Sequence, residues 1–295
     1  MALIFGVPLL LVAAPMFIWP SPWLAAALLL AGPMAYATLF VLVAGTLSLP
    51  FQRAIVPGTF PRDLSHPVYK ARRLYGLCWT SVYYFKPLYF LCLTVPPLKW
   101  LTFRLFGYRG SMDFTVYPDT WIRDLPLLDL GPGTYLANRA TLGTNMCLRD
   151  GTLIVNSIKT GRNCLVGHLS MLAPGVVMED ESEVAVGCAV GIGARIGAGA
   201  LVNGRASVNH FSRVGANARV ENGAYVGLKA KIGDGLVLPP CIMVPPRASL
   251  RTQDDVSRLI STANADVTRF GRQPEPVLQE PAPGIASNPR TAAES

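Results

Sequence analysis

The chain has 295 residues, of which 51% are hydrophobic and 15% charged, and its formal net charge is +8. A mean hydropathy of +0.36 is too apolar for an ordinary soluble domain and indicates a membrane component. The six cysteines form no CxxC pair and show no metal-site spacing, so we predict free thiols.

Residues 1–52 contain no charged side chain, and the sequence WPSPW separates two apolar runs within them. Each run is long enough to cross about 30 Å of hydrocarbon at about 1.5 Å per residue. Proline and interfacial tryptophan suit the connection between two spans. We therefore predict a transmembrane helical hairpin over residues 1–52. No basic residue precedes the first run, which disfavours a secretory signal, and a buried hairpin of a soluble core is the alternative.

The positive charge is concentrated in the next segment, since residues 53–109 hold nine Lys or Arg and one acid, Asp63. A basic excess directly after a span marks the cytoplasmic side and suits anionic membrane lipids. The same segment is rich in aromatic residues and leucine, which favours interfacial or re-entrant helices over residues 53–112 and disfavours nucleic-acid binding.

A six-residue period follows, of which VGIGARIGAGAL (residues 190–201) is a clear example. Six fits neither the 3.6-residue period of a helix nor the two-residue period of a strand. It fits coils of three short strands, eighteen residues long, whose inward residues stack about 4.8 Å apart. Nineteen positions fall in this register, and all but Thr160 are apolar: Leu130, Leu136, Leu142, Leu148, Ile154, Thr160, Val166, Leu172, Met178, Val184, Val190, Ile196, Val202, Val208, Val214, Val220, Val226, Ile232 and Leu238.

This pattern, aliphatic-Gly-x-x-small-x, resembles that of the hexapeptide-repeat acyltransferases, here in a membrane-anchored variant. The resemblance implies a left-handed parallel β-helix, which we place at residues 113–250 with about six coils. The unshifted frame predicts coils without a protruding loop. A short helix is expected over residues 251–270, and the Pro-rich polar residues 271–295 are predicted to be disordered.

Two histidines take the third place of their hexads. His210, in VNHFSRVG, lies in a stretch similar to one in which the family carries a catalytic general base, and imidazole suits that role because it titrates near neutrality. His168, in VGHLS, resembles a stretch near the acyl carrier in the same families. Asp150 precedes His168 by one coil length, so we expect it to stack beside His168 and hold its tautomer. The alternative is that both histidines only hydrogen-bond the turns at their corners.

Asp180 follows Arg162 by one coil length of eighteen residues, so we expect these two residues to form a structural ion pair. Near the end of the repeat, CIMVPPRASL resembles a stretch whose basic residue meets coenzyme A phosphate in many acetyltransferases. That resemblance implies a cofactor-binding role for Arg247, with Lys229 and Lys231 as further candidates; generic surface charge is the alternative.

Related β-helices hold zinc through three spaced histidines, which the histidines of this chain cannot supply, so no metal is predicted. The resemblance implies an acyltransferase, with acetyl-CoA or another acyl-CoA as donor and a hydroxyl or amine of a cell-envelope glycan or lipid-linked precursor as acceptor. We expect it at the cytoplasmic face of a bacterial-type inner membrane, and the family implies a homotrimer. The alternative is a non-catalytic scaffold that docks a membrane-bound synthase.

Overall fold

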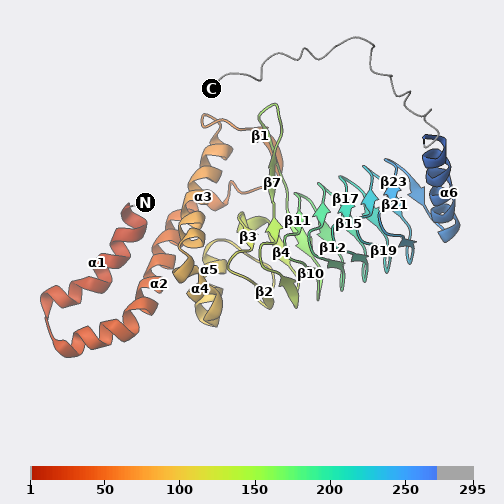
Figure 1. The fold of residues 1–295 in the computed structure, drawn as a ribbon. Helices are drawn as coiled ribbons and strands as arrows, with labels where there is room; N and C mark the ends of the chain where they lie inside the picture. The colour runs from red at the N-terminus through yellow and green to blue at the C-terminus, as the bar shows by residue number, and fades with distance from the viewer. Residues whose placement is uncertain (1, 271–295) are drawn as a thin grey trace, which may run out of the picture. The chain divides into compact units, whose positions relative to one another are not determined.

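A computed structural model describes residues 2–270, with side-chain exposure for residues 2–262; the tail predicted for 271–295 lies outside this range. The described part begins with α1 (Ala2–Ile18) and α2 (Pro22–Gln52), which form a hairpin (Figure 1). Within residues 2–270, α2 is the helix that is long and apolar enough to cross a membrane, and α1 is shorter than that test requires. The two predicted spans thus become one helix of spanning length and one shorter apolar helix.

The two halves of α2 have different surroundings. Near its start, Leu29 and Leu30 are 80% and 84% exposed. Near its end, Phe40 and Val41 are completely buried, and Gly45 lies so close to Leu105 of α5 that a Cβ atom would collide with that side chain. The second half of α2 is therefore part of a protein core, whereas the first half presents apolar side chains outward.

Three helices occupy the segment predicted to hold interfacial helices: α3 (Pro67–Tyr84), α4 (Lys86–Thr94) and α5 (Pro96–Leu105). Each has a proline in its first turn, where a backbone N–H would have no acceptor within the helix, so the proline removes no hydrogen bond. Trp79 of α3 is fully buried between the rings of Tyr89, Phe103 and Phe106, and its indole N–H donates to the carbonyl oxygen of Ile122 at 2.7 Å. This contact ties the helices to the β-domain.

The β-domain is a left-handed parallel β-helix, as predicted. It has three faces, and each face is a parallel sheet of seven strands, so it has seven coils where about six were expected. The strands outside the hexad register lie at both of its ends, before Leu130 and after Leu238. The first sheet contains β2 (Phe114–Val116), β5 (Thr134–Leu136), β10 (Leu165–Val166), β13 (Glu183–Val184), β16 (Leu201–Val202), β19 (Arg219–Val220) and β22 (Val237–Leu238).

The other two sheets continue the same coils. The second contains β3 (Trp121–Ile122), β6 (Thr141–Leu142), β11 (Met171–Leu172), β14 (Ala189–Val190), β17 (Ser207–Val208), β20 (Tyr225–Val226) and β23 (Met243–Val244). The third contains β4 (Leu128–Leu130), which follows the short 3-10 helix η1 (Leu125–Leu127), and β9 (Ile158–Thr160), β12 (Val177–Met178), β15 (Arg195–Ile196), β18 (Arg213–Val214), β21 (Lys231–Ile232) and β24 (Ser249–Leu250).

The hexad residue of each coil strand points inward. Val184, Val202 and Val220 pair in register on successive coils and are completely buried. Thr160, the polar exception, is accommodated because its hydroxyl lies 2.9 Å from that of Thr134, the first residue of β5. A paired hydroxyl in the stack costs far less than an unpaired one, so the period tolerates this residue.

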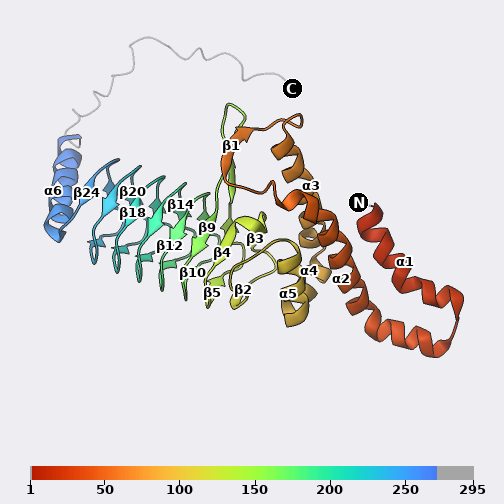
Figure 2. The same ribbon diagram turned by 180° about the vertical axis from the view of Figure 1, so that it is seen from behind.

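The coils are interrupted once, contrary to prediction. Between Leu142 of β6 and Thr160 of β9 the chain forms a hairpin of β7 (Asn145–Cys147) and β8 (Thr152–Val155), and β1 (Gly58–Pro61) pairs with β8 (Figure 2). Leu148 and Ile154 therefore lie in the hairpin rather than in the stack. The insertion adds two hexad lengths, and an insertion that is a multiple of six does not shift a six-residue frame.

After the last coil, α6 (Gln253–Phe270) confirms the predicted C-terminal helix. It crosses the boundary after Val256 that divides the chain into two compact units. Asp254 and Asp255 lie in its first turn, where acidic side chains interact favourably with the helix dipole.

Candidate active site on the β-helix

His210 follows β17, at the corner where the chain turns from the second sheet to the third, and is half-buried. Its Nδ1 accepts a hydrogen bond of 2.8 Å from the backbone N–H of Ile192, one coil earlier. A neutral imidazole that accepts through Nδ1 carries its proton on Nε2. The corner thus holds the ring in one orientation, with Nε2 as a hydrogen-bond donor.

A cavity of about 260 Å³ opens beside this ring. Its surface is mostly apolar and comes from the second sheet, the corner that follows it and one side chain of the hairpin: Met146, Met171, Ala173, Ala189, Val190, Gly191, Ser207, Val208, Asn209, His210 and Tyr225. Asn209 connects two of its polar groups, because its amide NH₂ donates to the Tyr225 hydroxyl at 2.5 Å and its Oδ1 accepts from the backbone N–H of His210 at 2.7 Å. Sequence reasoning missed Met146 and Tyr225, since neither contribution follows from the hexad pattern.

His168 lies at a different corner, between the first and second sheets, two coils before His210. It is exposed, and among residues 2–270 no group hydrogen-bonds its imidazole. His168 does not line the cavity beside His210. His168 and His210 thus lie on adjacent corners of the β-helix, and the expected role of His168 stays a prediction.

Asp150 does not stack beside His168, so that prediction is wrong. It lies in the turn of the β7–β8 hairpin, where its carboxylate accepts from the backbone N–H of Thr152 at 2.9 Å, a bond that lowers the pKa of Asp150. The strand pairing places Asn138 at the coil position before His168. The eighteen-residue subtraction crossed the insertion and therefore identified the wrong neighbour.

Where no insertion intervenes, a separation of eighteen residues correctly identifies neighbours on successive coils. Arg162 and Asp180 form the predicted ion pair, with Nη2 and Oδ2 2.9 Å apart. The backbone N–H of Arg162 also donates to Asp180 Oδ1 at 2.8 Å, and these bonds lower the pKa of Asp180.

The three basic residues expected to bind coenzyme A lie at two different places on the β-helix. Lys229 and Arg247 are exposed at the corner that also holds His210, and the Lys229 N–H donates to the His210 carbonyl oxygen at 2.9 Å. Both corner residues have positive φ, 57° and 63°. Lys231 lies past the corner, on the outer face of the third sheet, next to Arg213 of the preceding coil. The structure therefore groups Lys229 and Arg247 with His210 and separates Lys231.

No group of three or more metal-ligating side chains that could hold an ion occurs among residues 2–270. The six cysteines, all within that range, are unpaired.

No protein-family model and no curated protein sequence matches this chain. Among solved structures it is similar to a GDP-perosamine N-acetyl transferase from Caulobacter crescentus, at 15% identity and a TM-score of 0.27, over 50% of this chain and 60% of that one. It is also similar to AntD, an N-acyltransferase from Bacillus cereus, at 10% identity and a TM-score of 0.26, over 57% of this chain and 94% of that one. The acetyltransferase domain of PglB from Neisseria gonorrhoeae shows 14% identity and a TM-score of 0.19, over 50% of this chain and 60% of that one. Structural similarities this weak carry no argument about activity. A function for the cavity must therefore be inferred from the geometry of the cavity itself.

Proposed function

We propose that this protein is an acyltransferase that moves an acyl group from an acyl-CoA, with acetyl-CoA as the first candidate, to a hydroxyl or amine, with His210 at the reacting centre. The observation that carries the proposal is an oriented imidazole in the wall of an apolar cavity of about 260 Å³. Ligand pockets for drug-sized molecules run from about 300 Å³ upward, so this cavity suits an acyl group rather than a nucleotide. Lys229 and Arg247, at the same corner, would hold the phosphates of the donor outside it.

The geometry supports a different role for His210 from the expected general base. A base acting at Nε2 needs its proton on Nδ1, but Nδ1 faces the N–H of Ile192. In the observed orientation Nε2–H can instead donate to the acyl carbonyl oxygen, on which negative charge develops during transfer. A fixed donor of this kind contributes about 10²–10³-fold to a rate, because it needs no reorganisation as the charge forms.

We further propose that α2 anchors the protein at the cytoplasmic face of the inner membrane and that the acceptor is a cell-envelope glycan or lipid-linked precursor. The apolar side chains exposed on α1 and the first half of α2 support a lipid environment. The basic excess that follows α2 supports the orientation, and its exposed members, among them Arg53, Arg73 and Arg109, support contact with anionic membrane lipids. An anchored enzyme and an anchored acceptor diffuse in one plane, which raises their effective concentration.

One observation favours the alternative, a non-catalytic scaffold, and equally a homotrimer. The outward positions of the second sheet carry no charge in any of its seven strands: Trp121, Thr141, Met171, Ala189, Ser207, Tyr225 and Met243. An uncharged sheet face suits contact with another protein, either a synthase or a second copy of this chain.

Thiol release from acetyl-CoA by the purified full-length protein, measured against a panel of amine and hydroxyl acceptors, tests the proposal. We expect His210→Ala to lower turnover about 10²–10³-fold and His210→Gln, which keeps a donor, to lower it less. His168→Ala is the matched control and should change at most the apparent affinity for the donor. Loss of turnover in His168→Ala with normal turnover in His210→Ala would reverse the assignment. A folded protein that releases no thiol with any acceptor would favour the scaffold.

A further inference from the structure

A second cavity, of about 210 Å³, lies between α3 and the antiparallel sheet β1-β8-β7. Four of its eight lining residues are arginines, and none is acidic: Arg62, Tyr69, Arg72, Arg73, Arg123, Asn145, Cys147 and Leu153. The arginines come from three places in the chain: Arg62 directly follows β1, Arg72 and Arg73 belong to α3, and Arg123 directly follows β3.

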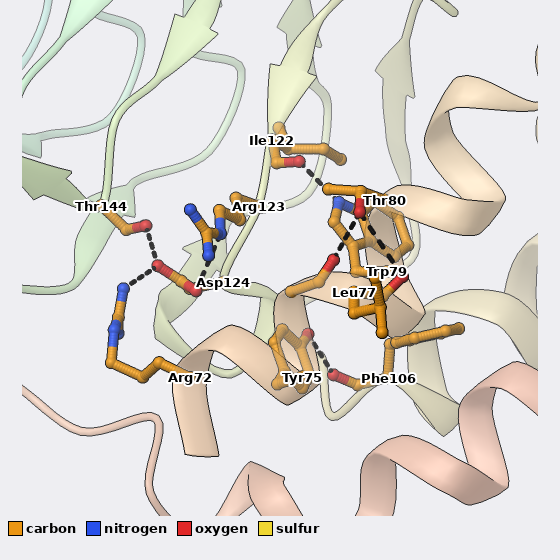
Figure 3. A network of polar contacts seen from close by, with 11 residues as sticks. Arg72, Tyr75, Leu77, Trp79, Thr80, Phe106, Ile122, Arg123, Asp124 and Thr144 are labelled. Carbon is orange, nitrogen blue, oxygen red and sulfur yellow. Dashed lines mark hydrogen bonds and ion pairs between the residues drawn. The ribbon is translucent and has the colours of Figure 1, made fainter. Parts of the chain in front are cut away.

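Arg72 is a built-in part of this cavity. Its side chain is 3% exposed, and Nη2 pairs with Oδ2 of the fully buried Asp124 at 2.6 Å (Figure 3). Thr144 donates to the same oxygen at 2.7 Å, which holds the carboxylate in place. Among the described residues, Arg72 Nη1 and Arg123 Nε are buried without a hydrogen-bond partner. Asp124 Oδ1 is buried without a partner as well, so these atoms belong to the wall behind the cavity surface. The donors that an anionic group in the cavity can reach are those of the exposed lining arginines, Arg62 and Arg73.

The positive charge of the cavity also favours an anionic ligand. Asp124, behind the lining, balances one of the four guanidinium groups, and Arg123 Nε is 3.9 Å from its other oxygen. The remaining positive charges repel one another around a small volume. Guanidinium groups, which stay charged at all ordinary pH values, pair with phosphate through two parallel hydrogen bonds.

The cavity continues along α3. Arg73 and Arg123 also line an adjoining hollow of about 370 Å³, whose other walls are Gly76, Leu77, Thr80, Tyr84 and Trp121. Arg123 lies across α3 at Gly76, where a Cβ atom would come within 2.6 Å of its Nη2. A ligand could therefore place an anionic group among the arginines while a larger, partly apolar group extends towards Tyr84 and Trp121.

From these contacts we propose that the Arg62–Arg72–Arg73–Arg123 cavity binds the phosphate group of a phosphate-bearing ligand. This site is separate from the His210 cavity and independent of the acyl-transfer proposal. The two cavities share one wall, because Asn145 and Cys147 of β7 line the arginine cavity and Met146, between them, lines the other.

The test is binding of pyrophosphate, and of phosphatidate against phosphatidylcholine in detergent micelles, to the full-length protein. We expect Arg62→Gln and Arg73→Gln to weaken phosphate binding about tenfold each, the scale of a lost charge-assisted hydrogen bond. Both side chains are exposed and outside the buried ion pair, so the fold should survive. Arg109→Gln, which removes an exposed charge of the same segment outside the cavity, is the matched control.

Gly76→Ala adds a test that changes no charge. The new methyl group would displace the Arg123 guanidinium, while alanine favours the helix, so binding should weaken without loss of thermal stability. Binding of pyrophosphate would assign the site to a phosphate group itself, and binding of phosphatidate alone would assign it to a membrane lipid. The proposal fails if neither ligand binds, or if Arg109→Gln weakens binding as much as Arg73→Gln. Thiol release plays no part in these measurements, so their failure is distinguishable from failure of the acyltransferase proposal.

Discussion

In the β-helix, Val202 contacts its equivalents Val184 and Val220 on the neighbouring coils, and the same contact recurs along the whole sheet. In the helices that precede it, the stabilising bonds join unrelated positions: Arg72 reaches Asp124, 52 residues away, and Gln52 reaches the Leu105 carbonyl oxygen, 53 residues away. The β-helix is therefore stabilised by one contact repeated many times, and the helical region by several different contacts that each occur once. The stability lost on substitution in the β-helix should therefore depend on whether the residue points inward. The stability lost on substitution in the helical region should depend on whether the residue's particular partner remains.

The largest effect is expected inside the repeat. Val202→Asp would place an unpaired carboxylate in the dry stack and destabilise the fold by about 5 kcal/mol, the upper range for buried unpaired charges. Leu201→Asp is the matched control, since Leu201 points outward between Glu183 and Arg219 and its replacement should cost less than about 1 kcal/mol. Chemical unfolding in detergent measures both. Equal destabilisation would mean that the inward assignment is wrong.

The next effect concerns the buried ion pair. Arg72→Leu leaves the Asp124 carboxylate buried without its cation, and we expect a loss of about 3–4 kcal/mol. The double variant Arg72→Leu with Asp124→Leu removes both charges and should recover much of that loss, since an apolar pair needs no compensating partner. The melting temperatures of the three proteins provide the comparison. A double variant no more stable than Arg72→Leu alone would show that the two residues do not act as a pair.

The smallest effect tests a bond of the repeat that is exposed to solvent. The pKa of Asp180 is lowered by hydrogen bonds from Arg162, so near its unfolded pKa the unfolded chain binds more protons than the folded one. Asp180 therefore contributes stability above its unfolded pKa and loses that contribution as the pH falls through its folded pKa. Asp180→Asn should make the melting temperature slightly less sensitive to acid between about pH 5 and pH 3. An unchanged acid dependence would show that this bond contributes nothing to stability.

The period of the sequence was sufficient to predict the β-helix, its inward residues apart from Leu148 and Ile154, and the Arg162–Asp180 pair, because strand pairing one coil away depends only on a repeated local spacing. Composition was sufficient to predict apolar N-terminal helices followed by a basic, aromatic segment. Tertiary structure alone decided the rest. The hairpin of β7 and β8 was invisible because its length preserves the frame, and it moved Asp150 away from His168. The orientation of His210 depends on the N–H of Ile192, and the arginine cavity depends on packing α3 against the first coil. Such contacts join residues far apart in the chain, where no local period specifies which side chains meet.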